Sequence, residues 1–242
     1  MATPHHRSDA TDRWSLATDG PCHRAVVMPL DGQRLPGWLS LPPTPRGLVV
    51  FAHGLGSSSL SHRNRQVAAR LLGGGLATLL FDLKAADEGA MPGDINRLAE
   101  RLVAALDWLA SDSRLAALPL GLYGSSLGAA VAVTATQARP QLVRALVSRG
   151  GRVDLVSGRL QHLDTPILLI VGSRDVDLLE LNRWSAGQIE APHQLMVING
   201  AGHLFQEPGA LDQVAEASLH WFEHWLCAAE RCGLPAETGS GA

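Results

Sequence analysis

The chain has 242 residues, of which 46% are hydrophobic and 18% are charged, and its formal net charge at pH 7 is −3. This length and composition suit one domain with one substantial core. The slightly negative charge argues against a nucleic-acid-binding protein, which normally carries a basic face. No apolar run is as long as a membrane-spanning helix, so we expect no membrane partner.

The two ends of the chain differ in composition from the part between them. Residues 1–20 are polar and contain no apolar signal-peptide core, and the last residues are mostly small. We therefore predict a flexible leader over residues 1–20, a single domain over 21–231 and a flexible tail over 232–242. The three cysteines are widely spread, with neither a disulfide pattern nor metal-binding spacing, which favours free thiols in a cytoplasmic protein.

Apolar runs and helical patterns alternate along the domain. Two N-terminal strands, over 24–29 and 35–41, are predicted to join in a hairpin at Asp31-Gly32. The later strands are short apolar runs typical of strands buried on both faces, at 47–52, 76–81, 118–123, 142–147, 166–171 and 193–198. Helices are predicted at 63–72, 94–109, 178–189 and 210–229, with another between residue 126 and Pro140. This alternation predicts an α/β fold with a mostly parallel sheet and helices on both faces.

One turn in the middle of the chain carries the clearest chemical signal. An apolar strand over 118–123 is followed by Gly124-Ser-Ser126-Leu-Gly128 and then by an alanine-rich helix. In such a strand–turn–helix the central serine adopts a strained backbone conformation that exposes its hydroxyl, and the flanking glycines avoid clashes. Ser126 is therefore our candidate nucleophile. The alternative is that a serine here merely caps the helix.

A serine hydroxyl needs a neighbouring base, and that base needs an orienting partner. Both follow at later strand ends, in the order Ser126, Asp175, His203, which is the order expected for this kind of turn. His203 would act as general base and general acid, and Asp175 would fix its tautomer. Asp177 is an alternative to Asp175, which lies nearer the end of its strand.

Acyl transfer also needs donors for the developing oxyanion. The backbone N–H of Leu127 is one candidate, and the N–H of Leu55, in the loop after the strand at 47–52, is preferred to that of Gly56 as the second.

Further residues near the predicted strand ends are candidates for contact with substrate. They are His53, Gly54, Arg63 and Arg149. A structural role in its loop is the stronger alternative for His53, and solvated or helix-capping arginines are an alternative to a positive field for an acidic ester. The full dinucleotide-binding fingerprint is absent, and we expect no cofactor and no metal.

These residues together carry a resemblance to a known family. His53-Gly-Leu-Gly, Gly-Ser-Ser126-Leu-Gly, Gly-Ser-Arg-Asp175 and Gly-Ala-Gly-His203 make residues 24–227 similar to α/β-hydrolases, and within them to the dienelactone hydrolase-like group. The resemblance implies an eight-stranded sheet with the second strand antiparallel. It also implies hydrolysis of an ester or lactone through an acyl-enzyme.

The chain departs from dienelactone hydrolases proper at two positions. These enzymes have a cysteine at the turn, where this chain has Ser126, and an arginine four residues after the histidine, where it has Glu207. Both departures favour a general carboxylesterase. The segment 151–165 is too short for a large cap domain, which predicts an open site for small or short-chain esters, including lactones or thioesters.

Other functions remain open at this point. A peptidase or an acyltransferase would use the same three residues, and a catalytically silent binding protein could share the fold. We expect a small-molecule ester as the partner, and a homodimer is possible.

Overall fold

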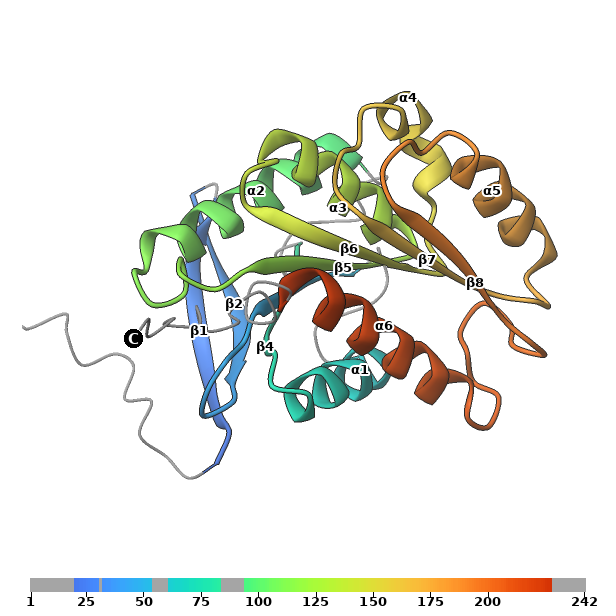
Figure 1. Ribbon diagram of the computed structural model, residues 1–242. Helices are drawn as coiled ribbons and strands as arrows, with labels where there is room; N and C mark the ends of the chain where they lie inside the picture. The colour runs from blue at the N-terminus through green and yellow to red at the C-terminus, as the bar shows by residue number, and fades with distance from the viewer. Residues whose placement is uncertain (1–19, 31, 54–60, 84–93, 228–242) are drawn as a thin grey trace, which may run out of the picture.

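The computed structural model describes residues 20–30, 32–53, 61–83 and 94–227, and it builds them around one eight-stranded sheet (Figure 1). The strands are β1 Cys22–Leu30, β2 Gln33–Leu41, β3 Leu48–Ala52, β4 Ala77–Phe81, β5 Leu120–Ser125, β6 Val143–Arg149, β7 Ile167–Gly172 and β8 His193–Ile198. Their order across the sheet is β1-β2-β4-β3-β5-β6-β7-β8. β2 is antiparallel to both of its neighbours, and the other pairings are parallel. The expected fold is confirmed, including its one antiparallel strand.

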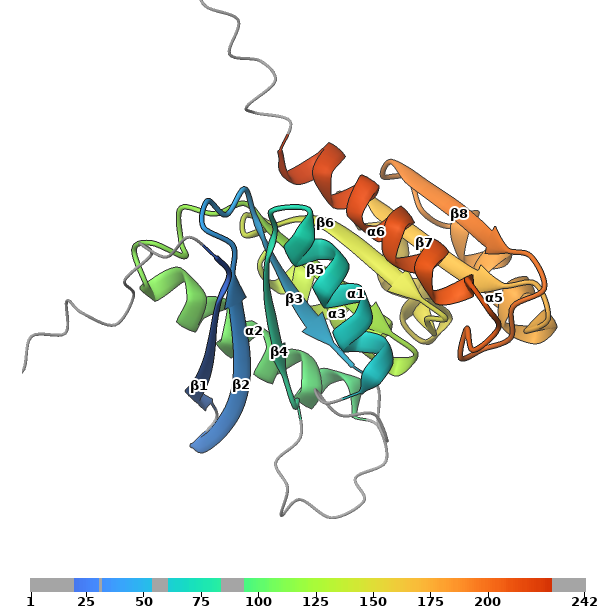
Figure 2. The ribbon, with the colours of Figure 1, turned by 90° about the horizontal axis from the view of Figure 1, so that it is seen from below.

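Helices cover both faces of this sheet. Figures 1 and 2 show α1 (His62–Gly73) and α6 (Ala210–Leu226) side by side on one face. On the other face lie α2 (Ile95–Ser111), α3 (Leu127–Ala138) and α5 (Val176–Ala186), together with the short 3-10 helix η2 (Val153–Val156) and α4 (Ser157–Leu160). Strands β3, β4, β5 and β7 are buried along their whole length, which is why they are mostly apolar, whereas the edge strand β8 begins with the exposed residues His193 and Gln194.

The strands divide their side chains between two cores by simple alternation. In β3, Val50 belongs to the core under α2 and α3, whereas Val49 and Phe51 belong to the core under α1 and α6. In β5, Leu122 and Tyr123 divide in the same way. The side of the sheet on which a residue lies can therefore be read from its position in the strand.

Element boundaries differ from the predicted ones where backbone hydrogen bonds decide them. The strand predicted at 118–123 is observed as Leu120–Ser125, because Gly124 and Ser125 still pair with β6. The helix predicted at 178–189 begins at Val176, directly after its N-cap residue Asp175. The helix predicted to start at Asp94 begins one residue later, at Ile95. Asp94 is its N-cap residue, and its carboxylate accepts hydrogen bonds from backbone N–H groups of the first turn of α2.

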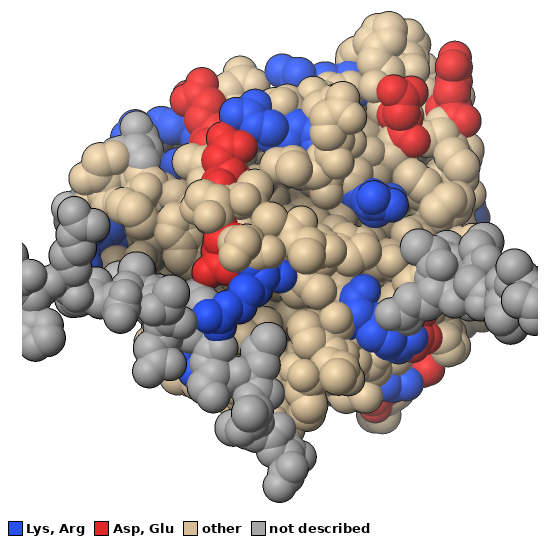
Figure 3. Space-filling model, turned by 60° about the vertical axis from the view of Figure 1, so that its left-hand side comes forward, with Lys and Arg blue, Asp and Glu red and all other residues tan. Residues whose placement is uncertain are grey.

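The expected absence of a large cap agrees with the connection between β6 and β7. That connection holds only η2 and α4, each four residues long, and the described part of the chain has no large cap over the sheet. No helix in the described ranges is long and apolar enough to cross a membrane. On the face shown in Figure 3, positive and negative side chains are interspersed.

Candidate active site

Ser126 occupies the bend between β5 and α3 with an unusual backbone conformation. Its φ is 51° and its ψ is −125°, and Phe205 is the other non-glycine residue with positive φ in the described ranges. The Ser126 side chain makes no capping hydrogen bond to α3. The capping alternative is therefore not supported, and the hydroxyl remains available for other contacts. A residue held in such a conformation is strained, and strain of this kind is characteristic of functional sites.

The two flanking glycines are required by close backbone approaches. A Cβ atom at Gly128 would lie 2.1 Å from the carbonyl oxygen of Ala52, and one at Gly124 would lie 2.5 Å from Cα of Ala129. Neither neighbour is a flexible side chain that can move away. The glycines thus let α3 start against the ends of β3 and β5, which fixes the position of Ser126.

His203 and Asp175 are in direct contact. His203 lies in the loop after β8, Asp175 lies between β7 and α5, and the distance from Nδ1 of His203 to Oδ2 of Asp175 is 2.7 Å. The Asp175 carboxylate makes no capping bond to its own helix. The exposed fraction is 45% for the His203 side chain and 20% for that of Asp175, so the imidazole has an accessible side and an anchored side.

Hydrogen bonds between the loops that follow β7 and β8 stabilise this contact. The N–H of Ser173 donates to Ile198, that of Arg174 donates to Ala201, and the N–H of Gly200 donates to the Ser173 hydroxyl, at 3.0, 2.9 and 2.8 Å. Phe205, only 2% exposed, anchors the histidine loop in the core at a φ of 52°.

Residues 149 and 150 lie between the serine and the histidine. The N–H of Ser126 donates to the carbonyl of Arg149 at 3.2 Å. The next residue, Gly150, faces the imidazole, because a Cβ atom built on it would lie 3.6 Å from Cε1 of His203. Strands β5, β6, β7 and β8 are consecutive in the sheet, so all three candidate residues gather at their carboxyl ends.

Of the two predicted oxyanion donors, the structure describes Leu127 but not Leu55. Leu127 is the first residue of α3, where backbone N–H groups have no acceptor within the helix. Leu55 and Gly54 lie outside the described residues, so their predicted roles stay predictions. Just before them, Nε2 of His53 lies 2.8 Å from Oδ1 of Asp82, at the ends of the neighbouring strands β3 and β4. His53 is 7% exposed, and this pairing favours its structural role.

The two arginines named as substrate contacts are both partly or fully buried. Arg149 is 8% exposed and its Nη1 atom is buried without a hydrogen-bond partner, as is the Nε atom of Arg63. Tyr123 is a further polar residue of this region, and its position within an apolar strand gave no signal of a functional role in the sequence. Tyr123 is 1% exposed, and burial raises its pKa to about 12, against the opposing effect of the Arg149 charge.

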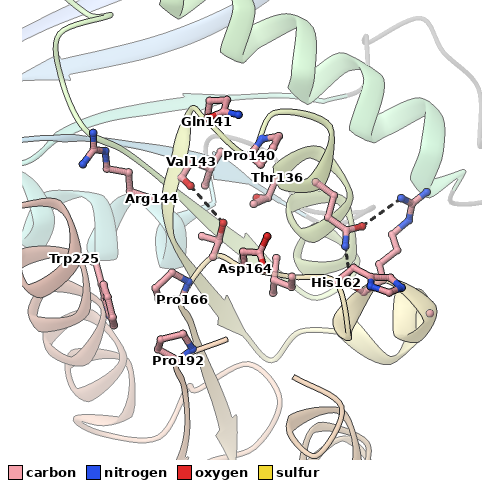
Figure 4. Close-up of a pocket in the computed structure, with 15 residues that line it drawn as sticks. Thr136, Pro140, Gln141, Val143, Arg144, His162, Asp164, Pro166, Pro192 and Trp225 are labelled. Atoms are coloured by element: carbon pink, nitrogen blue, oxygen red, sulfur yellow. Dashed lines mark hydrogen bonds between the residues drawn. The ribbon is translucent and has the colours of Figure 1, made fainter. Parts of the chain in front are cut away.

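A hollow lies at the other end of the strands, beside the starts of β6 and β7. Its volume is about 1100 Å³, and Thr136, Arg144, His162, Pro166 and Trp225 are among its lining residues (Figure 4). It contains none of the three candidate catalytic residues, and it lies where β6 and β7 begin rather than where they end. Within the described ranges, no group of three or more His, Cys, Asp or Glu residues is arranged to hold a metal ion.

Comparison with known proteins identifies similar chains. A curated protein of Mycobacterium tuberculosis, provisionally named a phosphoribosyl transferase, is 47% identical over 215 residues, which are 87% of this chain and 48% of that protein. The chain thus spans about half the length of this relative. An uncharacterized protein of the same organism is 30% identical over 222 residues, with coverage of 79% of this chain and 75% of that protein.

Solved structures and a family model match most of the domain. The dienelactone hydrolase of Anabaena variabilis is similar, with a TM-score of 0.83, 42% identity, and coverage of 86% of this chain and 99% of that one. Est1E of Butyrivibrio proteoclasticus shares the fold, with a TM-score of 0.72, 17% identity, and coverage of 83% and 98%. The model of the alpha/beta hydrolase domain matches residues 45–226. The chain therefore belongs to the alpha/beta hydrolase family.

Proposed function

We propose that this protein is a serine hydrolase that cleaves carboxylic esters through an acyl-enzyme. The observation that carries the proposal is the 2.7 Å contact between His203 and Asp175, beside a strained turn that carries Ser126. The family and the similarity to a dienelactone hydrolase support a hydrolase in general. The residues that carry the chemistry, and the ester as substrate, are our proposal.

In the proposed mechanism, Oγ of Ser126 attacks the ester carbonyl while Nε2 of His203 takes its proton. The tetrahedral intermediate collapses when His203 returns that proton to the leaving alcohol, which breaks the ester bond and leaves Ser126 acylated. Water then gives its proton to His203 and attacks the acyl group, and Ser126 leaves with the proton restored. Asp175 accepts the Nδ1–H of His203 throughout, which keeps Nε2 free to act as the base.

The developing negative charge needs backbone donors. We propose the N–H of Leu127 as one donor, because the start of α3 is close to the nucleophile and has no acidic residue in its first turn. Leu55 is proposed as the second, from the sequence alone. Loss of one such donor typically lowers kcat by about a hundred- to a thousandfold.

The substrate is proposed to be a small or short-chain ester, with lactones and thioesters in the same range. The support is the short connection over η2 and α4, where larger hydrolases can insert a cap. A cytoplasmic location and a homodimer stay predictions.

The test is hydrolysis of a 4-nitrophenyl ester series from acetate to dodecanoate. We expect activity that falls as the acyl chain lengthens, covalent labelling of Ser126 by a fluorophosphonate, and a loss of about 10⁴-fold or more in kcat for Ser126→Ala. Ser125→Ala is the matched control, because it removes the same hydroxyl one residue earlier and should retain most of the activity. An unchanged rate in Ser126→Ala would assign the nucleophile elsewhere.

A further inference from the structure

Arg149 is a buried cation beside the nucleophile turn. It is the last residue of β6, it pairs with Ser125 of β5, and its carbonyl accepts the N–H of Ser126. Its exposed fraction is 8%, and its Nη1 atom is buried without a hydrogen-bond partner. Within the described ranges, its guanidinium forms no ion pair and no hydrogen bond.

Tyr123 lies on the same side of the sheet. Along β6, Ala145 and Val147 belong to the core under α1 and α6, so alternation places Arg149 on that side too. Tyr123 belongs to the same core, and it is close enough to Arg149 for the positive charge to act on its pKa. The Tyr123 hydroxyl is buried without a hydrogen-bond partner. The Arg149 guanidinium and the Tyr123 O–H thus lie on neighbouring strands and on the same side of the sheet, and each has a buried donor without a partner.

The first turn of α1 adds to the positive character of this side. The helix has no acidic residue in that turn, and its N-cap residue Ser61 makes no side-chain capping bond. Asn64, 1% exposed, lies one turn before Val67 and Ala68 on the sheet-facing side of α1. Because α1 runs back from the carboxyl edge of the sheet, its N-terminal end lies at the edge that carries Ser126.

A buried charge without a counter-charge is costly, and folded proteins seldom keep one unless a ligand or a reaction uses it. The usual compensation would be an acidic side chain. The position four residues after His203 does not supply a positive charge for a substrate, because it is Glu207. In this structure Glu207 accepts a hydrogen bond from the N–H of Gly202 at 3.0 Å, which leaves Arg149 as a different kind of anion site.

We propose that the Arg149 guanidinium and the Tyr123 hydroxyl bind an oxyanion group, a carboxylate or a phosphate, carried by the ester that Ser126 attacks. The inference rests on the proposed function and makes the substrate an anionic ester. The planar guanidinium can donate two parallel hydrogen bonds to such a group, and the tyrosine adds a third donor.

The first experiment compares two esters with the same number of acyl carbons, neutral 4-nitrophenyl butyrate and the anionic mono-4-nitrophenyl ester of succinate. We expect the wild-type kcat/KM to be higher for the succinate ester, and Arg149→Met to lower the ratio of the two values by about 30-fold. Arg149→Lys should lower it less. The control is Arg144→Met, on the same strand but exposed at the opposite edge, which should leave the ratio as it is.

Two kinetic outcomes would overturn the proposal. One is an equal loss on both esters in Arg149→Met, which would assign Arg149 a general structural or electrostatic role. The other is a ratio that does not change.

A second experiment measures binding without turnover, so that it does not depend on the proposed function. Succinate and inorganic phosphate are titrated separately against Ser126→Ala, with sodium chloride at matched ionic strength, and thermal unfolding is followed. We expect one of the two anions to raise Tm, and the stronger one identifies the chemistry of the group. The rise should disappear when Arg149→Met is added.

The Arg149→Met protein itself should be at least as stable as the wild type, because an uncompensated charge is replaced by an apolar chain of similar length. If it fails to fold, Arg149→Lys replaces it in both experiments. If the protein hydrolyses both esters but shows neither a preference for the anionic ester nor a rise in Tm with either anion, the anion subsite is rejected and the proposed function stands. If an anion raises Tm through Arg149 but no ester is hydrolysed, the proposed function is rejected and the subsite stands.

Discussion

Asp175 and Asp177 show how single residues at one strand end divide their roles. Asp175 is the N-cap residue of α5 and Asp177 lies in its first turn. From the sequence alone, either could be the partner of His203. In the structure the Asp175 carboxylate contacts His203, whereas Asp177 is exposed in the first turn of α5. Asp175 therefore supports the imidazole, and Asp177 is placed to interact with the helix dipole.

We expect Asp175→Asn to lower kcat by about 10³- to 10⁴-fold, because an amide N–H facing Nδ1 favours the wrong tautomer of His203. Asp177→Asn, the same substitution two residues later, should change kcat by less than about threefold, since surface charges of this kind have small effects. Steady-state kinetics on the best ester of the series provides the measurement. Similar losses in both variants would contradict the assignment.

At the scale of elements, the site depends on how closely α3 approaches β3. Gly128 allows this approach, whereas Gly73, near the end of α1, has open space around it. The two glycines therefore make a matched pair for the same substitution.

Gly128→Ala is expected to cost about 3 kcal/mol or more, because the new methyl group would meet the Ala52 carbonyl and neither backbone can move freely. Gly73→Ala should stabilise the protein by up to about 1 kcal/mol through helix propensity. Urea unfolding of both variants measures the difference. A Gly128→Ala protein as stable as the wild type would show that the approach of α3 to β3 is looser than the structure has it.

Glu207 stabilises the loop that carries His203. The backbone N–H groups of Glu207 itself and of Gly202 donate to its carboxylate, which lowers the pKa of Glu207 below its ordinary value. A lowered pKa means that the ionised form is the stabilising one. This stability is present above the pKa of the unfolded chain and is lost as pH falls through the pKa of the folded protein.

Glu207→Gln should therefore lower Tm at neutral pH, and the difference from the wild type should shrink as pH falls below the ordinary range for glutamate. Thermal unfolding measured from pH 7 to acid pH tests this. The exposed residue Glu190, changed in the same way, serves as the control. A difference that stays constant over the pH range would mean that the charge of Glu207 does not stabilise the loop.

At the scale of the molecule, the described helices all pack around one sheet, with two large apolar clusters and a small one beside α5. The family model matches residues 45–226, and the chain spans 48% of its curated relative named after a phosphoribosyl transferase. The shared part is therefore an alpha/beta hydrolase domain, which in this relative is part of a longer protein. The predicted domain over 21–231 extends beyond this match at both ends.

We predict that residues 21–231, expressed alone, unfold in one cooperative transition with a Tm close to that of the full chain and hydrolyse the same esters. A single core system of this size normally behaves as one unit. Thermal unfolding and the ester assay on both chains test the boundaries. A lower Tm or lost activity in the shorter chain would place part of the domain outside 21–231.

Much of this protein follows from local sequence. Apolar runs identify β3, β4, β5 and β7 because these strands are buried on both faces, and the Gly124–Gly128 pattern identifies the turn because only glycine fits beside the neighbouring backbones. The order Ser126, Asp175, His203 points to the strand ends at which we propose the active site, and the contact between Asp175 and His203 agrees with it. Buried strands and tight turns can be recognised in the sequence because burial and backbone conformation restrict which residue types can occupy these positions.

The tertiary structure decided the rest. Only the packing of β7 beside β8 brings Asp175, and not Asp177, to His203. Only the alternation of side chains in β5 and β6 places Tyr123 and Arg149 on one side of the sheet, where both are buried with unused donors. These contacts join residues that are distant in the chain. The composition of a single segment does not determine which other segment packs beside it.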